Sequence, residues 1–260
     1  MQFSSYGDLF FILYNPDPQY NPEPIVLQSE EIEGKVTNRY AASYGLLNIG
    51  SIVVDNENTI YLEDAVPDDQ TIEDKKNRVM LNSRVLRFSK FGKLIDFIGQ
   101  DGVGGTPFPF IHSLHLTKKD ELVVFSQIPS AWLVFWFSKK GRLLFSHTFE
   151  LDKLPVEKNQ FVFLSGLYPD MNEYKIYLHL SYSVEEVDQS TKTKITIKSK
   201  NSRIYTYDME ENNYKGFFTI PEGGKRKYRG SIGEIEIPLP SYEFIGTCER
   251  DYFYLLRPDV

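Results

Sequence analysis

Carboxylate side chains are the residues of this chain best suited to bind a cation or to act in acid–base chemistry. Asp55, Asp64 and Asp101 each lie near the end of an apolar run, and oxygen ligands of this kind bind Ca²⁺. Aspartate is also common in tight turns, because its carboxylate accepts hydrogen bonds from nearby backbone amides. We therefore expect these aspartates to stabilise turns, with a Ca²⁺ site as the alternative.

The histidines and the cysteine form no recognisable pattern of metal ligands or of a nucleophile with its base. His112 and His115 are three residues apart, and in a strand an odd spacing directs two side chains to opposite faces. Cys248 is the only cysteine, so it excludes an internal disulfide and is expected to be a buried thiol. The sequence also lacks the linear signatures of serine hydrolases, zinc peptidases, kinases and P-loop enzymes. No catalytic residue is identified, although residues contributed by separate repeats would leave no such signature.

Two stretches have the composition of ligand-binding loops. The segment GQDGVGG (99–105) is rich in glycine, but no helix follows it to bind a phosphate, so we predict a structural turn. The segment GGKRKYRG (223–230) is basic and could contact an acidic protein, an anionic lipid surface or a polysaccharide. With two aromatic residues that follow the glycine-rich segment, it supplies the predicted binding residues: Lys225, Arg226, Lys227, Tyr228, Arg229, Phe108 and Phe110.

The composition favours a β-rich globular protein that does not bind nucleic acid. Of the 260 residues, 41% are hydrophobic and 15% aromatic, and aromatic side chains are favoured in strands. The formal net charge of −7 opposes association with phosphate backbones. The longest apolar run, 131–137, is shorter than the roughly 20 residues of a membrane-spanning helix, and the N-terminus shows no signal-peptide pattern.

A repeated turn indicates how the chain is organised. FSSYGDL (3–9), FSKFGKL (88–94) and FSKKGRL (137–143) keep Phe, Ser, Gly and Leu in place. Each copy is flanked by β-type residues and predicts a hairpin closed by a glycine with positive φ. A degenerate fourth copy begins at Tyr207. Further hairpins are predicted before the last three copies and near the C-terminus, over 50–64, 113–126, 163–181 and 242–258.

This order of hairpins predicts an all-β fold of the β-propeller type, built from four-stranded antiparallel blades. If the repeated turn closes the outer hairpin of each blade, the chain has three complete units and a half unit at each end. The apolar run AWLVFWF (131–137) fits, because a blade is buried on both faces. We predict one propeller domain over 1–260, either a small ring in which the half units pair or a piece truncated at both ends.

The stretch 52–110 resembles a blade of the NHL-repeat propellers. The matching residues are Val54-Asp55, Ile60-Tyr61, Asp64, Arg78 or Arg84 with Val85, Phe88, Gly92, Gly99, Gly102 and Phe108-Pro109. The resemblance weakens after residue 110 and is one of strand order alone beyond residue 150. It implies an interaction module, since NHL-type repeats commonly have that role. The tyrosine-rich, cysteine-poor chain is also similar to uncharacterised bacterial envelope proteins, which implies a periplasmic or lipid-anchored location, with the cytoplasm as the alternative.

Loop lengths predict which end of the propeller carries function. Turns within hairpins are short, whereas the connections between hairpins, such as 65–77 and 182–201, are long. In an up-and-down blade the long connections all emerge at one end, and scaffolds carry their binding residues on such loops. We predict a non-catalytic binding or scaffold module that recognises a protein or a glycan. The alternative is a hydrolase or lyase with a site in the central channel, assisted by a divalent cation.

Overall fold

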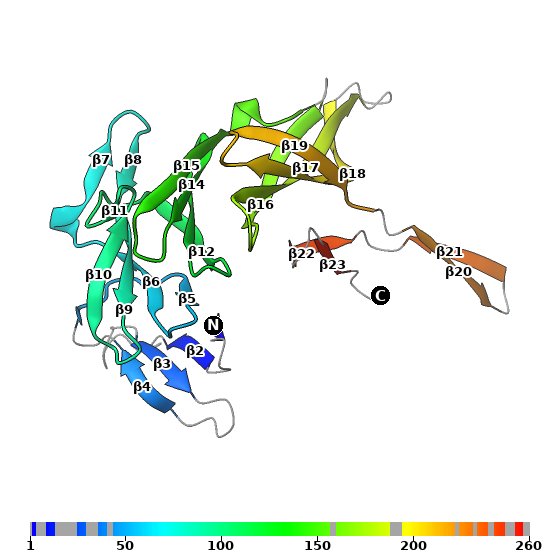
Figure 1. Cartoon of the computed structure of the whole chain (residues 1–260). Coiled ribbons are helices and arrows are strands. Elements are labelled where there is room, and N and C mark those ends of the chain that lie inside the picture. Colours follow the sequence, from blue (N-terminus) through cyan, green and yellow to red (C-terminus); the bar gives the residue numbers. More distant parts are fainter. Residues whose placement is uncertain are drawn as a thin grey trace. The chain divides into compact units, whose positions relative to one another are not determined.

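The structure, a computed structural model, consists of β-strands with short turns and two single-turn 3₁₀ segments over the residues that it describes (Figure 1). The described residues are 2–3, 9–13, 25–29, 36–40, 44–156, 160–187, 194–221, 224–230, 233–238, 242–247 and 253–256. Across these ranges no helix is long and apolar enough to cross a membrane. The chain divides into two compact units, Met1–Phe149 and Glu150–Val260, and each is described by itself. The single domain over 1–260 stays a prediction.

The first unit contains three antiparallel sheets and one separate hairpin. The first sheet has the order β1-β2-β3-β4, with β1 (Gln2–Phe3), β2 (Leu9–Leu13), β3 (Ile25–Ser29) and β4 (Val36–Tyr40). The second has the order β11-β10-β9-β6-β5, with β5 (Ile52–Val54), β6 (Ile60–Ala65), β9 (Ser83–Phe88), β10 (Leu94–Gly99) and β11 (Gly102–Val103). The third has the order β12-β13-β14-β15, with β12 (Phe110–Leu116), β13 (Leu122–Ile128), β14 (Ala131–Phe137) and β15 (Leu143–Glu150). The hairpin pairs β7 (Ile72–Asp74) with β8 (Val79–Leu81).

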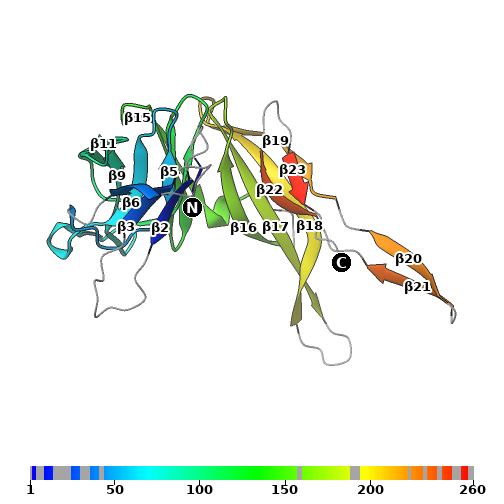
Figure 2. The same cartoon turned by 90° about the horizontal axis from the view of Figure 1, so that it is seen from below.

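The second unit contains one four-stranded sheet and two hairpins. The sheet has the order β16-β17-β18-β19, with β16 (Gln160–Pro169), β17 (Lys175–Val187), β18 (Lys194–Asp208) and β19 (Asn213–Thr219). The hairpins pair β20 (Lys225–Gly230) with β21 (Gly233–Pro238) and β22 (Glu243–Thr247) with β23 (Phe253–Leu256). Figure 2 shows β17 and β18 extending past β19, as their register requires. The long connection predicted over 182–201 is therefore largely a continuation of these two strands.

The prediction of an all-β, propeller-like fold of four-stranded antiparallel sheets is confirmed, but the count of units differs. The hairpin β1–β2 is continued by β3 and β4 into a complete sheet, so the described residues form four sheets of four or five strands and three separate hairpins, where three complete and two half units were expected. The turn of FSSYGDL therefore joins the first and second strands of its sheet. Sequence reasoning missed β3 and β4 because these short strands are separated by segments rich in proline and glutamate.

In the first unit, neighbouring sheets pack face to face, and the middle sheet is buried on both sides. Ile60 and Leu62 of β6 pack in a cluster with Phe10 of the first sheet. Tyr61, between them, packs in a second cluster with Phe135 of the third sheet. Because successive side chains of a strand point to opposite faces, one strand contributes to two cores, which explains why its apolar residues are continuous.

The repeated phenylalanine has an equivalent place in the second and third sheets. Phe88 ends β9 and is buried in the cluster shared with the first sheet, and Phe137 ends β14 and is buried in the cluster shared with the second sheet. Each ring thus packs against the preceding sheet. This equivalence confirms that the repeated motif marks a structural unit, although the side chain of Phe3 lies outside the described residues.

The turns after these phenylalanines also share one hydrogen-bonding scheme. The hydroxyl of Ser89 accepts a hydrogen bond from the amide of Lys93, and the hydroxyl of Ser138 accepts one from the amide of Arg142. The third residue after each serine is a glycine with positive φ, at 76° for Gly92 and 79° for Gly141. A β-carbon is strained in this conformation, so the turn requires a glycine three residues after the serine, and both copies have this spacing.

The glycine-rich segment 99–105 forms the predicted structural turn between β10 and β11. Gly99 pairs with Gly102, and the carboxylate of Asp101 accepts hydrogen bonds from the amide and hydroxyl of Thr106. A β-carbon on Gly99 would lie 2.4 Å from the carbonyl carbon and oxygen of Gly105. Glycine is needed at this position because two segments of backbone approach each other too closely for a side chain.

We predict that Gly99→Ala lowers the free energy of unfolding of the first unit by about 1–3 kcal/mol, because the backbone must move to accept the methyl group. Both tryptophans, Trp132 and Trp136, lie in β14, so urea unfolding followed by tryptophan fluorescence reports on this unit. Gly104→Asn is the matched control, since its β-carbon would meet no atom within 4 Å and asparagine tolerates positive φ. Equal midpoints for wild type and Gly99→Ala would contradict the prediction.

Candidate functional site

The long connections of the second sheet gather at one end of the first unit. Antiparallel strands place the turns 55–59 and 89–93 at one end of this sheet, and the connection 66–82 and the link 100–109 at the other. The connection carries the β7–β8 hairpin, which projects from that end in Figure 1. The turn between β13 and β14 of the third sheet reaches the same end, because its residues line a groove with this hairpin and link. We name this end the loop end.

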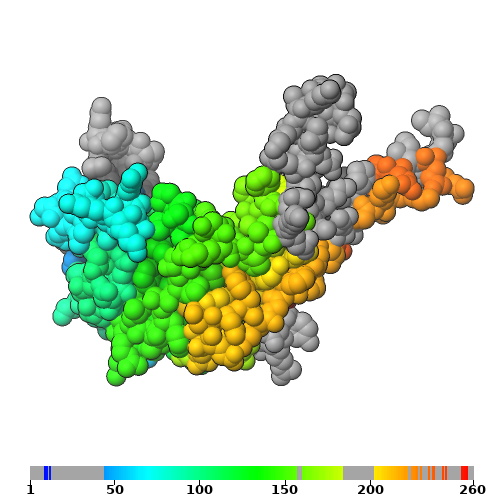
Figure 3. All heavy atoms as spheres, turned by 90° about the horizontal axis from the view of Figure 1, so that it is seen from above, coloured from blue at the N-terminus to red at the C-terminus, as the bar shows by residue number. Residues whose placement is uncertain are grey.

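A groove of about 490 Å³ lies at the loop end, between the hairpin and the third sheet. Its lining residues are Val79, Met80, Asn82, Pro109, Phe110, Gln127, Ile128 and Pro129. None of them is charged, and two of the largest are exposed, Met80 by 51% and Phe110 by 61%. Figure 3 shows the hairpin in cyan beside the green residues of the third sheet. We name this feature the Met80–Phe110 groove.

The link that carries Phe110 is fixed in place by hydrogen bonds and by a buried ring. Phe108 exchanges backbone hydrogen bonds with Ser83 at the start of β9. Its ring is fully buried and packs edge-to-face on Phe135 and Phe137, at 5.1 and 6.2 Å between centroids. Two residues later, the carbonyl of Phe110 accepts a hydrogen bond from the hydroxyl of Ser126. The predicted pair therefore has two roles, since Phe108 anchors the link in the core and Phe110 reaches the surface.

A second, more polar hollow of about 490 Å³ adjoins this groove and shares Pro109 and Ile128 with it. Its polar lining residues are Asp74, Asn77, Gln100, Ser146, His147 and Thr148. Hydrogen bonds from the side chain and amide of Asn77 and from the amide of Lys76 lower the pKa of Asp74. Asp74 is therefore a carboxylate at neutral pH and presents an acceptor next to the apolar groove.

The three aspartates considered as cation ligands each stabilise a separate turn. Asp55 accepts hydrogen bonds from the amides of Glu57 and Thr59, and Asp101 bonds Thr106 as described above. Asp64 is fully buried, accepts hydrogen bonds from the amides of Leu47 and Asn48 and pairs with Arg84. Among the residues that the structure describes, no group of three or more His, Cys, Asp or Glu side chains is arranged to hold a metal ion.

The histidines of β12 do not follow the simple alternation expected from their spacing. The register of β12 with β13 shifts between Ile111 and Ser113, so a bulge at His112 interrupts the alternation of faces. Ser113 and His115 are joined by a 3.1 Å hydrogen bond between Oγ and Nε2. Burial, and to a lesser extent the neighbouring His112, lowers the pKa of His115 to about 4.

The basic stretch lies in the second unit, and two of its lysines pair with glutamates of the neighbouring strand. Lys225 is 3.3 Å from Glu236, and Lys227 is 2.9 Å from Glu234. Arg226 and Arg229 are exposed, whereas the side chain of Tyr228 and all of Cys248 lie outside the described residues. β20 and β21 therefore form a hairpin with both acidic and basic side chains. It belongs to a different unit from Phe110, so a shared site of Phe110 with the basic residues stays a prediction.

Sequence reasoning missed Met80, which faces the groove from β8. The sequence signal was weak, because Val79, Met80 and Leu81 are three apolar residues after a highly charged loop, and the predicted connection ended at residue 77. Only the pairing of β7 with β8 brings this short apolar run to the surface beside Phe110.

We predict that the first unit loses stability as the pH falls from 7 to 5, partly through His115. The folded state depresses the pKa of His115, so the unfolded chain, with a histidine pKa of about 6.5, takes up the proton first and unfolding is favoured, by about 1–2 kcal/mol at pH 5. Urea unfolding of His115→Gln should show a flatter dependence on pH than wild type. Burial also lowers the pKa of His112, so His112→Gln should flatten the dependence too, but less than His115→Gln. An unchanged slope in His115→Gln would refute the assignment.

Comparisons with known proteins identify no family for this chain. No family profile matches it, and no curated protein does. A solved structure titled "Structure of Dos1 propeller" is similar, with 13% sequence identity and a TM-score of 0.31, over 88% of this chain and 65% of that one. This chain thus spans about 65% of the length of that structure. A likeness of this size supports no detailed comparison, and the propeller-like fold is established by the strand pairing described above.

Proposed function

We propose that the chain is a non-catalytic binding module that recognises an extended segment of a partner protein in the Met80–Phe110 groove. The observation that carries the proposal is the exposure of these two large apolar side chains on an uncharged groove. Exposed apolar surface of this kind is characteristic of sites that bury it against a partner. The groove is built on connecting loops that a rigid sheet positions, as in many binding scaffolds.

The lining of the groove favours a polypeptide over a glycan as its ligand. Val79, Met80, Ile128 and two prolines offer aliphatic surface, which suits the apolar side chains of a peptide. Asn82 and Gln127 carry amide groups that can donate to and accept from peptide bonds. A sugar would leave most of its hydroxyl groups facing apolar atoms here, at the cost of their hydrogen bonds to water.

Asp74 in the adjoining hollow favours ligands that carry a hydrogen-bond donor next to their apolar residue. Its lowered pKa keeps it ionised, and the hollow shares Pro109 and Ile128 with the groove. A ligand that continues from the groove into the hollow therefore meets a carboxylate acceptor. We propose an apolar residue followed by a lysine, an arginine or another hydrogen-bond donor as the recognised pattern.

Two finer assignments accompany this proposal. The resemblance of 52–110 to NHL repeats supports an interaction role. A bacterial envelope location, periplasmic or lipid-anchored, is inferred from composition alone and has the cytoplasm as its alternative.

A peptide library displayed on phage tests the proposal. Selection on the full chain should enrich peptides with a shared apolar residue, and calorimetry with the best peptide should show affinity reduced about tenfold or more by Phe110→Ser, the loss expected of a well-packed anchor. Val103→Ser, which removes an apolar side chain of similar exposure outside the groove, should bind normally. The proposal fails if no shared pattern is enriched or if Phe110→Ser binds as tightly as wild type.

A further inference from the structure

The turn 89–93 carries the most exposed large apolar side chain among the described residues. Phe91 is 81% exposed. The equivalent turn of the third sheet, 138–142, has the same serine and glycine hydrogen bonds and places Lys140 at the corresponding position. The backbone of this turn therefore does not require an aromatic residue. The exposed ring at its tip is thus apolar surface that a ligand can cover.

Phe91 borders a hollow of about 780 Å³ at the end of the second sheet opposite the loop end. The hollow is lined by two turns of one sheet and by the start of β10: Asn56, Glu57, Asn58, Thr59, Ser89, Lys90, Phe91 and Ile95. Its volume falls within the range of about 300–1,000 Å³ found for small-ligand sites. Six of these eight residues carry hydroxyl, amide or charged groups. This hollow is thus mainly polar, whereas the Met80–Phe110 groove is mainly apolar.

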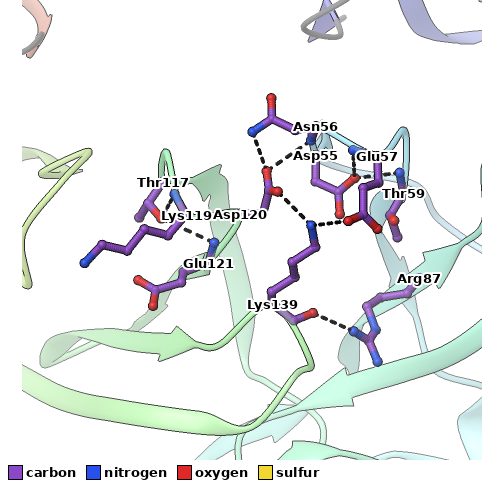
Figure 4. Close-up of polar contacts among 10 residues, drawn as sticks. All are labelled: Asp55, Asn56, Glu57, Thr59, Arg87, Thr117, Lys119, Asp120, Glu121 and Lys139. Atoms are coloured by element: carbon purple, nitrogen blue, oxygen red, sulfur yellow. Dashed lines mark hydrogen bonds and ion pairs between the residues drawn. The ribbon is translucent and has the colours of Figure 1, made fainter.

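The polar wall of the hollow is held rigidly by contacts with the third sheet (Figure 4). The carboxylate of Asp120 accepts hydrogen bonds from the amide and the side chain of Asn56, at 3.0 and 2.9 Å. The ammonium group of Lys139 donates to Glu57 at 2.7 Å and to Asp120 at 2.9 Å. We name these four residues the turn clamp. Because the clamp fixes Asn56 and Glu57 in advance, a ligand need not order them on binding.

One buried atom beneath the wall of the hollow lacks a hydrogen-bond partner among the described residues. The side-chain oxygen Oδ1 of Asn58 is inaccessible to solvent and has no hydrogen-bond partner among the described residues. Asn58 has a φ of 61°, so asparagine suits the backbone conformation, but glycine would serve the turn equally well. Since an atom that is inaccessible to solvent is also out of reach of a ligand, Asn58 contributes to the turn and not to ligand contacts.

We propose that the Phe91 hollow binds a neutral oligosaccharide. The face of an aromatic ring is electron-rich and attracts the C–H groups on one face of a pyranose. Fixed amide and carboxylate groups beside the ring can bond the hydroxyl groups at the edge of the sugar. Lys90, whose ammonium group is 5.1 Å from the ring centre, and Glu57 have opposite charges, so the site selects for neither sign. This site goes beyond the peptide-binding function proposed above and does not depend on it.

An array of neutral oligosaccharides, followed by calorimetry with the best-bound soluble one, tests the proposal on the full chain. Wild type should bind, and Phe91→Ser should weaken binding about tenfold or more, whereas Phe91→Tyr should retain it because the ring is kept. Asn58→Gly, which keeps the turn and removes a side-chain oxygen that a ligand cannot reach, should bind normally. Lys140→Ala, at the tip of the equivalent turn, is the matched control and should bind normally.

The remaining outcomes would overturn the proposal. Binding of no oligosaccharide on the array, or equal binding by Phe91→Ser, excludes a sugar site at Phe91. Sedimentation velocity tests a second copy of the chain as occupant, and a concentration-dependent dimer that Phe91→Ser abolishes would replace the sugar by that copy. Phe110→Ser should leave oligosaccharide binding unchanged, so failure of this site and failure of the peptide groove are separable. Unaltered urea midpoints for each variant show that the fold is intact.

Discussion

The burial of a sheet on both of its faces is the constraint on which the first unit depends. Alternate residues of β6 pack in two different cores, with Ile60 and Leu62 on one side and Tyr61 on the other. A strand in this position favours a continuous apolar run, and the polar residues of β6, Glu63 and Asp64, lie toward its end. The two ends of the sheet carry most of its exposed polar groups, and both candidate sites lie there.

The two ends of the sheet differ in their connections, because one end has short turns and the other has long connections. At one end, short polar residues fix each hairpin: Ser89, Ser138 and Asp55 accept hydrogen bonds from amides of their own turns. The turn clamp then joins the second sheet to the third, and the carboxylates of Glu57 and Asp120 raise the pKa of Lys139, which stays charged. At the loop end, Phe108 is the corresponding fixed point. Its buried ring holds a link that exposes Phe110 two residues later, so a core residue positions an exposed one.

The two ends therefore offer different chemistry from one scaffold. The Met80–Phe110 groove is uncharged and largely aliphatic, whereas the hollow beside Phe91 is lined mainly by hydroxyl, amide and charged groups. A module with such a pair of surfaces could hold a protein segment at one end and a hydroxyl-rich ligand at the other. The buried middle of the sheet separates the two, so substitutions at one surface need not disturb the other.

The sequence by itself determined the class of fold and the chemistry of its turns, because both depend on local order. Apolar runs broken by Ser-x-x-Gly or Asp-rich turns specify antiparallel hairpins wherever they occur, and the repetition at Phe88 and Phe137 specified equivalent units. β3 and β4 are short strands beside segments rich in proline and glutamate. Sequence reasoning missed them for the same reason, because their local pattern is weak. Tertiary structure alone decided that Phe108 is buried while Phe110 is exposed, and that Met80 joins Phe110. It also placed Lys225 and Lys227 within ion-pair distance of glutamates of β21. These outcomes depend on which segments distant in the chain pack together, and no spacing of residue types records that.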